Sequence, residues 1–377
     1  MHLDNGVRAI SADSHVTEPP NCFADYIDPA FREVAPRVVT RDGRGDVFVI
    51  EGLKTDVPFG LMAAAGRDPA ELKDASKLFG ELHRGGWDPK ARLADQDRDG
   101  VAAEIIYPTV GMVICNHPDI DYKRACFHAY NRWIEDFQSG APDRLFALPL
   151  TPVASVDEAI KDVQGFRDRG FKGVMFPGFP GTAEDYDHPS FDRLWSALEE
   201  LEMPISFHVF AGGKDDGGMR YSGGHRGPPM NRWGDVIHAN QALIGMFILS
   251  GVFERHPKLK LVGVEGDAGW APHYIYRMDH AFQKHRYWLK PGADLKQPPS
   301  TYFNENVYLT FQDDWVAFKM THLMNPRRLM WANDFPHSDA TWPDSQALLA
   351  EHTAHLSEQE RSWILRDNVR ELYGLPV

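Results

Sequence analysis

The sequence predicts an α/β protein built as a single (β/α)8 barrel. Short apolar runs alternate with segments of helical periodicity along most of the chain, and eight of these runs have the length and composition of strands. No glycine-rich dinucleotide or phosphate fingerprint follows the first run. Eight strands alternating with helices in 377 residues fit one closed barrel better than two doubly wound domains. We therefore expect one domain over residues 1–377.

The strands are predicted where apolar runs end in polar residues, and helices where the apolar period lengthens between them. Ser155 and Ser357 stand where capping residues would begin two of the helices. The expected strands are residues 8–13, 104–107, 145–148, 173–176, 205–208, 259–264, 307–310 and 329–332, and the clearest helices are 120–139, 156–169, 191–202 and 239–254.

Three segments interrupt this alternation and are predicted to be insertions or long loops. Residues 36–87 contain an alternating hairpin stretch at 47–50 and a helical stretch at 63–79, which together indicate a cap. Residues 211–229 hold seven glycines and two prolines, so we expect a long loop after the fifth strand. Residues 290–303 are expected to form a further irregular connection.

Composition excludes several classes of protein. A formal net charge of −14 disfavours nucleic acid or an anionic membrane as the main partner. The N-terminal segment has no apolar run typical of a signal peptide, and no stretch reaches the roughly 20 apolar residues that span a membrane. The three cysteines lack metal-type spacing, which suits a reducing cytoplasm.

The chemistry is expected at the carboxyl ends of the strands, because that face of such a barrel carries the reactive groups. Asp13 and His15 alternate along the first strand, so their side chains lie on one face and can chelate one ion. His208 and Asp334 come from other strand ends and complete a set of two imidazoles and two carboxylates. This mixture predicts one divalent metal ion, Zn²⁺ or Mn²⁺.

Other polar and aromatic residues near these strand ends are candidates for binding substrate. Glu18 and His337 lie within four positions of an expected ligand. Cations cluster in and just after the loop that follows the fifth strand, where they could hold a substrate carboxylate. Aromatic residues near the strand ends indicate an aromatic or cyclic small molecule as the ligand. The cations are Lys214, Arg220, His225, Arg226 and Arg232, and the aromatic residues are Trp87, Trp233, Trp270, Phe335 and Trp342.

A series of short motifs in order resembles the amidohydrolase-related family that includes amino-carboxymuconate-semialdehyde decarboxylase. The resemblance runs from about residue 8 to the C-terminus and implies a (β/α)8 barrel, one divalent metal, a homodimer, and either decarboxylation or hydrolysis. The family's ligands would fall on Asp13, His15, His208 and Asp334. The motifs are Asp13-x-His15-x-x-Glu18-Pro19, RLADQDRDGV (92–101), ALPLTP (147–152), GFKGVMF (170–176), PISFH (204–208), EGDAGWAP (265–272) and ANDFPHSD (332–339).

The chain departs from the family pattern at two positions. Those decarboxylases usually begin with His-x-His or Glu-x-His, where this chain has Asp13. Those decarboxylases have an acid–base histidine after the sixth strand, and Glu265 stands at the matching position here. The family's assignment of the proton donor therefore does not apply directly to this chain. Met175 and Phe176 also stand where binuclear amidohydrolases have a bridging lysine, which favours one metal.

Two reactions fit these residues. Two ligand carboxylates neutralise a divalent ion, which favours polarising an oxygen-rich substrate over acidifying water and so favours decarboxylation of an aromatic or related unsaturated acid. Asp334, Glu265 or His337 would then deliver the proton to carbon. The alternative is hydrolysis of an amide, lactone or C–C bond by metal-bound water, with the same residues as bases. The third interpretation of the sequence is a binding protein of this fold that has no catalytic activity.

Overall fold

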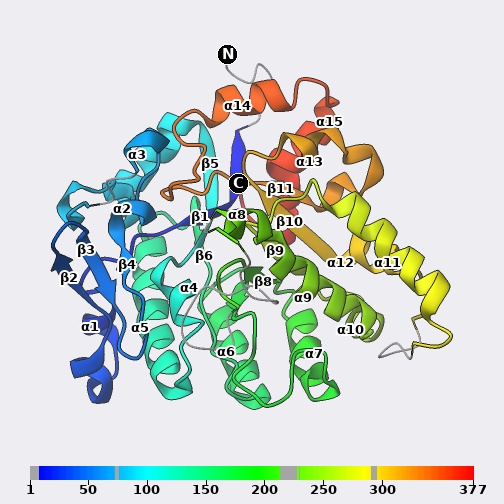
Figure 1. The fold of residues 1–377 in the computed structure, drawn as a ribbon, viewed down its shortest axis with the longest axis horizontal. Helices are drawn as coiled ribbons and strands as arrows, with labels where there is room; N and C mark the ends of the chain where they lie inside the picture. Colours follow the sequence, from blue (N-terminus) through cyan, green and yellow to red (C-terminus); the bar gives the residue numbers. More distant parts are fainter. Residues whose placement is uncertain (1–7, 73–75, 213–226, 229, 290–294) are drawn as a thin grey trace.

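The computed structural model describes residues 8–72, 76–212, 227–228, 230–289 and 295–377. Its parallel strands form two runs of neighbours, β1-β5-β6 and β7-β8-β9-β10-β11. The runs meet at a parallel bridge between Leu150 and Met175, and again where the Asp334 amide donates to the Asp13 carbonyl over 3.0 Å. The strands therefore close into a barrel, and Figure 1 shows the helices arranged around it.

The eight barrel strands coincide with the eight that the sequence predicts, with shifts at several ends. β1 extends two residues further than expected, because the His15 amide donates to the Phe335 carbonyl over 2.7 Å. Its buried side chains place both Asp13 and His15 inside a strand. The strands are β1 Ala9–His15, β5 Val101–Tyr107, β6 Leu145–Ala147, β7 Val174–Phe176, β8 Ile205–His208, β9 Leu261–Val264, β10 Val307–Phe311 and β11 Leu329–Trp331.

The helices also follow the predicted pattern, with one break. The expected helix over 239–254 is two helices, because Gly251 adopts a left-handed φ of 77° between them. Ser155 and Ser357 both accept amide hydrogen bonds at helix starts, as predicted. The longer helices are α3 Pro89–Asp99, α5 Ile120–Ser139, α6 Val156–Asp168, α7 Asp192–Glu200, α9 Ile237–Leu249, α11 Ala271–His285, α12 Pro299–Asn306 and α14 Ser345–His352.

Shorter helical segments connect these elements. The irregular connection expected at 290–303 instead contains the start of α12 in its described part. The short helices are α1 Cys22–Tyr26, α2 Phe59–Met62, α4 Val110–Ile114, α8 Asn231–Asp235, α10 Val252–Arg255, α13 Trp315–Lys319, α15 Glu358–Ser362 and α16 Asn368–Tyr373. The 3-10 or π turns are η1 Pro29–Val34, η2 Pro69–Glu71, η3 Phe79–Glu81, η4 Arg84–Gly86, η5 Pro189–Phe191, η6 Thr321–Leu323, η7 Pro326–Arg328 and η8 Trp363–Asp367.

The segment after η1 forms a small antiparallel sheet of β2 Arg37–Arg41, β3 Gly45–Val49 and β4 Val57–Pro58 beside the barrel (Figure 1). The helix expected over 63–79 is wrong in its described part: only the turns η2 and η3 lie there. Gly66 has a φ of 73°, which disfavours other residues, and a Cβ at this position would lie 3.0 Å from the Trp342 ring, closer than ordinary contact. This contact joins the segment to the loop after β11, so tertiary packing overrides local helical periodicity.

Among the described residues, no helix combines the length and the apolar character needed to cross a bilayer.

Candidate metal centre and active site

β1 brings Asp13 and His15 into the barrel interior, where both side chains are fully buried. The Nδ1 of His15 lies 2.9 Å from the Pro108 carbonyl oxygen. A carbonyl only accepts, so Nδ1 carries the proton and Nε2 presents its lone pair. That Nε2 lies 3.2 Å from an oxygen of Asp13.

β8 ends in His208, whose ring is held in the same way. Its Nδ1 lies 2.9 Å from the Val209 carbonyl, which leaves the lone pair on Nε2. The Nε2 atoms of His208 and His15 are 3.2 Å apart. When both Nε2 atoms are unprotonated they cannot hydrogen-bond to each other, and a cation between them would stabilise this approach.

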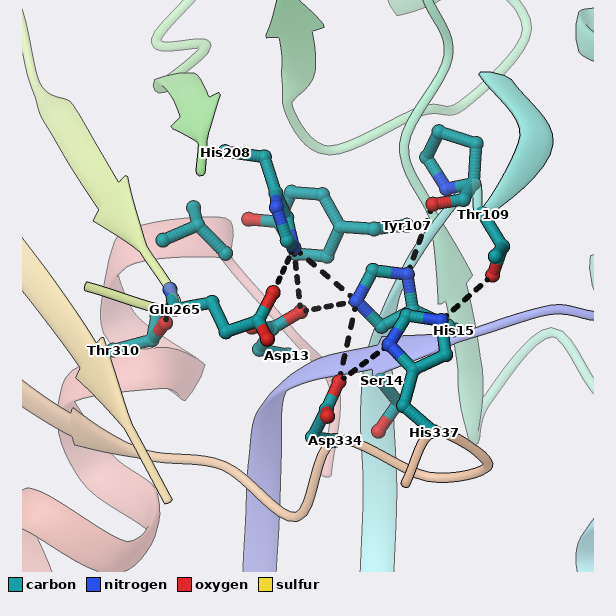
Figure 2. A network of polar contacts seen from close by, with 12 residues as sticks. Asp13, Ser14, His15, Tyr107, Thr109, His208, Glu265, Thr310, Asp334 and His337 are labelled. Atoms are coloured by element: carbon teal, nitrogen blue, oxygen red, sulfur yellow. Dashed lines mark hydrogen bonds and ion pairs between the residues drawn. The ribbon is translucent and has the colours of Figure 1, made fainter. Parts of the chain in front are cut away.

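Two further carboxyl groups enter the same space just beyond β9 and β11. Glu265 lies 3.5 Å from His208 Nε2, and Asp334 lies 3.4 Å from His15 Nε2 (Figure 2). Both residues have a left-handed backbone, with φ of 56° for Glu265 and 53° for Asp334. Such conformations are costly outside glycine and concentrate at functional sites. Here they turn the two side chains inward.

Several oxygens of this cluster lack a hydrogen-bond partner among the described residues although they are buried. They are both oxygens of Asp13, both of Asp334 and Oε2 of Glu265. Buried polar atoms are normally paired, and a site for an ion is one standard reason for exceptions. The donors within mutual reach are Asp13, His15, His208 and Glu265, joined at His15 by Asp334 and His337.

The electrostatics of the cluster lead to the same inference. Burial raises the pKa of Glu265 well above its usual value, and repulsion from Asp334 adds to this. Burial likewise raises the pKa of Asp334, with a further contribution from Asp13. Burial lowers the pKa of His15 to about 3, with a smaller effect of His337. For His208 burial acts in the same downward direction, but the Asp13 carboxylate outweighs it and raises the pKa. A buried cluster of carboxylates and imidazoles that shift one another's pKa values is an environment that a divalent cation stabilises. The donor set fits such an ion.

His337 packs against this set from the loop after β11. Its ring stacks on His15 with centroids 3.9 Å apart, and its Nδ1 lies 3.0 Å from Asp334. Its Nε2 lies 2.9 Å from the hydroxyl of Thr109, whose own proton goes to the Val16 carbonyl over 2.6 Å. Nε2 therefore donates to Thr109, and the His337 lone pair on Nδ1 faces Asp334. Thr109 was not predicted from the sequence. Its position just beyond β5 would have indicated it, because residues that follow the barrel strands lie on the face that carries the reactive groups.

Glu18 lies close by in the sequence but makes different contacts. It is fully buried, and its oxygens accept backbone hydrogen bonds of 3.0–3.1 Å from Thr109, Val110 and Gly111 at the start of α4. Both oxygens are committed to the backbone. These contacts favour an anchoring role over the substrate contact that the sequence predicts.

A buried ion pair contacts the backbone of the segments that carry the candidate ligands. Arg92 on α3 and Glu104 on β5 are 0% and 1% exposed, with 2.6 Å between Nε and Oε2. The same guanidinium donates to the carbonyl of His15 at 2.8 Å and to that of Phe335 at 3.3 Å. Arg92 thus joins the two segments that carry Asp13, His15 and Asp334. A glutamate inside an otherwise apolar strand signals such a partner, because a buried charge needs one.

The remaining predicted residues lie elsewhere or outside the described chain. Arg220, His225 and Arg226 lie outside the described residues, as does Lys214. The Trp270 indole donates to the Gly266 carbonyl over 2.7 Å, and its ring contacts Tyr274 and Phe303 on α11 and α12. These contacts place Trp270 in the helical layer beside the barrel.

The fold and this donor set define a class: (β/α)8-barrel enzymes with histidine and carboxylate ligands at the strand ends. Residues 54–375 match the family model described as amidohydrolase, so the chain belongs to the amidohydrolase family. It is a metal-dependent enzyme of the decarboxylase and hydrolase class of that superfamily.

Two curated relatives are decarboxylases. The chain is 25% identical over 250 residues to gamma-resorcylate decarboxylase of Rhizobium sp. (strain MTP-10005), covering 62% of this chain and 71% of that protein. It is 23% identical over 312 residues to 2-amino-3-carboxymuconate-6-semialdehyde decarboxylase of Dictyostelium discoideum, covering 81% of this chain and 82% of the relative.

Solved structures share the fold over almost the whole chain. An amidohydrolase of Mycobacterium avium subsp. paratuberculosis K-10 superposes with a TM-score of 0.77 at 23% identity, covering 99% of both chains. A 5-carboxyvanillate decarboxylase of Novosphingobium aromaticivorans, with bound manganese and a nitrobenzoic acid, gives a TM-score of 0.69 at 20% identity and covers 99% of this chain and 98% of that one.

Proposed function

We propose that the protein catalyses the non-oxidative decarboxylation of an aromatic or related unsaturated carboxylic acid, with one Zn²⁺ or Mn²⁺ held by Asp13, His15, His208 and Asp334. The observation that carries this proposal is the convergence of Asp13, His15 and His208 on one space, with the two Nε2 atoms 3.2 Å apart and Asp334 3.4 Å from His15 Nε2. The decarboxylase activities of the curated relatives support the choice of reaction.

The ion would supply positive charge that holds and polarises the substrate oxygens. Two ligand carboxylates balance the charge of that ion, which suits binding an oxygen-rich acid. His15 and His208 keep their lone pairs directed inward because carbonyl groups hold their Nδ1 protons. This arrangement fixes both rings before any ligand arrives.

We assign the proton donor to Glu265. Its unpartnered Oε2 faces His208, and burial raises the pKa of this carboxyl well above its usual value, which favours the protonated form that a proton donor requires. That proton moves to the substrate carbon that carries the carboxylate. The carbon–carbon bond then breaks, CO₂ leaves, and the electron pair restores the unsaturated system. Water returns a proton to Glu265.

The assignment is tested with the metal-loaded protein and a panel of hydroxybenzoates, by measuring released CO₂. Glu265→Gln should lower kcat at least about a hundredfold while metal content stays at one ion per chain. Asp267→Asn is the matched control, because Asp267 follows the same strand with a φ of 54°. Unchanged turnover in Glu265→Gln would remove the residue from the reaction.

Hydrolysis is the second candidate, and the contact between Asp334 and His337 favours it. Their 3.0 Å approach forms a carboxylate–imidazole pair that could accept a proton from water. Incubation of esters, lactones and ring-cleavage diketones in ¹⁸O-labelled water separates the two reactions. Incorporated label without CO₂ release from any acid would replace decarboxylation by hydrolysis.

The resemblance also led us to expect a homodimer, and the cysteine content a cytoplasmic location. Both stay predictions, as does the assignment of residues 36–87 as a cap on a single domain.

A further inference from the structure

A small cavity adjoins the candidate metal centre on the side of α9. It measures about 210 Å³ and lies beyond the ends of β7 and β8, with His208 itself in its wall. Most of the remaining wall is apolar and comes from the loop after β7, from β8 and from α9: Phe179, Phe207, Ala239, Ala242, Leu243 and Met246.

A larger groove of about 520 Å³ lies between α9 and α11, which run beside each other in Figure 1. Its wall is also largely apolar, with Leu249 on α9 and Phe282 and Leu289 near the end of α11. Leu249 is 37% exposed and Leu289 is 52% exposed. The groove therefore offers an apolar surface that the described chain leaves uncovered.

The cavity and the groove share part of their walls. Ala242 and Met246, one helical turn apart on α9, line both of them. The loop after β7 also reaches both, with Asp185 in the cavity and Asp187 in the groove. From Ala239 in the cavity to Leu249 in the groove, the α9 residues that line the two spaces extend about 15 Å along the helix axis. The cavity at His208 and the surface groove therefore adjoin along α9, and together they are called the apolar path.

We propose that this path binds an unbranched apolar chain of the substrate, so that the enzyme acts on carboxylic acids whose ring carries an alkyl tail. The proposal rests on the proposed function, since the acid group must lie at the metal centre for the tail to enter the path. The position of His208 in the wall of the adjoining cavity favours a substrate tail over other occupants of the groove.

Burial of the tail should be visible in the specificity of the enzyme. Each fully buried methylene is worth about fourfold in affinity, and a chain in a partly open groove gains less. With the metal-loaded protein and 2,4-dihydroxy-6-alkylbenzoates carrying methyl, propyl, pentyl and heptyl chains, we expect kcat/KM to rise at least about tenfold from methyl to pentyl.

Filling the junction should remove this preference. Met246→Trp and Ala242→Trp place an indole where the cavity and the groove meet, and both positions are accessible enough to accept it, since neither is buried. In these variants the ratio of kcat/KM for the pentyl compound to that for the methyl compound should fall to about one. Leu323→Trp is the control, because Leu323 is 53% exposed on η6 and lines neither space.

A binding measurement makes the proposal independent of turnover. Calorimetry with 5-alkylresorcinols, the products of these acids, should show affinity that rises with chain length in the wild type and in Leu323→Trp only. Equal affinity for all chains, or the same rise in Met246→Trp, would overturn the proposal even if the acids are decarboxylated. Chain-dependent binding without any CO₂ release would refute decarboxylation and retain the apolar path.

The groove could instead contact a second copy of the chain. Leu249→Asp, examined by analytical ultracentrifugation, distinguishes this arrangement. A change from dimer to monomer with an unaltered chain-length profile would overturn the assignment of the outer groove to the substrate tail.

Discussion

Arg92 offers the sharpest test of how the barrel holds the proposed metal ligands. Its guanidinium and the Glu104 carboxylate are almost wholly buried, 2.6 Å apart, and Arg92 also donates to the carbonyls of His15 and Phe335. In Arg92→Met the Glu104 carboxylate stays buried but no longer has a cation beside it. Breaking a buried ion pair in this way costs about 3–5 kcal/mol.

That cost converts into a measurable shift of the melting temperature. Unfolding entropy of about 2.1 cal/mol/K per residue over 377 residues gives about 0.8 kcal/mol/K. A loss of about 4 kcal/mol should therefore lower Tm by about 5 °C in scanning calorimetry. Arg84→Met is the matched control: Arg84 forms an exposed ion pair with Asp88, its side chain is 75% exposed, and Tm should change by about 1 °C or less.

The same substitution should weaken the metal centre. Arg92 holds the backbone at His15 and next to Asp334, so its loss should reduce metal affinity by about 10–100-fold, measured by competition with a chelator. Adding Glu104→Gln removes the uncompensated charge and should recover part of the lost stability, but not the lost affinity. A Tm within about 1 °C of wild type together with unchanged affinity would refute the reasoning.

The metal ligands and a buried glutamate give the remaining predictions. Asp13→Asn and His208→Ala should each lose the one metal ion per chain that elemental analysis finds in the wild type, whereas Asp313→Asn, an exposed acid, should keep it; retention in both ligand variants would refute the site. Removing the metal with a chelator should lower Tm by about 5 °C at a metal concentration 1,000 times Kd, where binding stabilises by about 4 kcal/mol, and no shift would mean that no ion binds the folded state. Burial raises the pKa of Glu18 from 4.5 to about 7, so the folded chain keeps a proton that the unfolded chain has lost. The free energy of unfolding of the metal-free protein should therefore fall by about 3 kcal/mol as pH rises from about 4.5 to 7, and an identical slope in urea titrations of Glu18→Gln would contradict this origin.

The barrel itself could be predicted because its signals are local. Strands with both faces buried are short apolar runs, and helices between them show a lengthened period, so most element positions follow from neighbouring residues. The helix expected at 63–79 failed because Gly66 is held against Trp342, a contact across more than 270 positions. The break at Gly251 required a backbone conformation that apolar periodicity does not encode.

The four proposed ligands could be nominated from the sequence for a different reason. Asp13, His15, His208 and Asp334 all stand at the ends of recognisable strands, and a closed parallel barrel brings those ends to one face. Their alternation within a strand also determines which side chains point inward. Local pattern and barrel symmetry together were enough to nominate these four residues.

The sequence alone therefore determined the class of fold, the strand ends and the four nominated donors. Only the tertiary structure decided how these donors are oriented and supported. The lone pairs of His15 and His208 face each other because the carbonyls of Pro108 and Val209 hold the opposite nitrogens. The pairing of Arg92 with Glu104 and the apolar path along α9 likewise join groups that are distant in the chain or in separate elements. Such contacts form between residues that the fold brings together across the barrel, so the residues next to each of them in the sequence do not predict them.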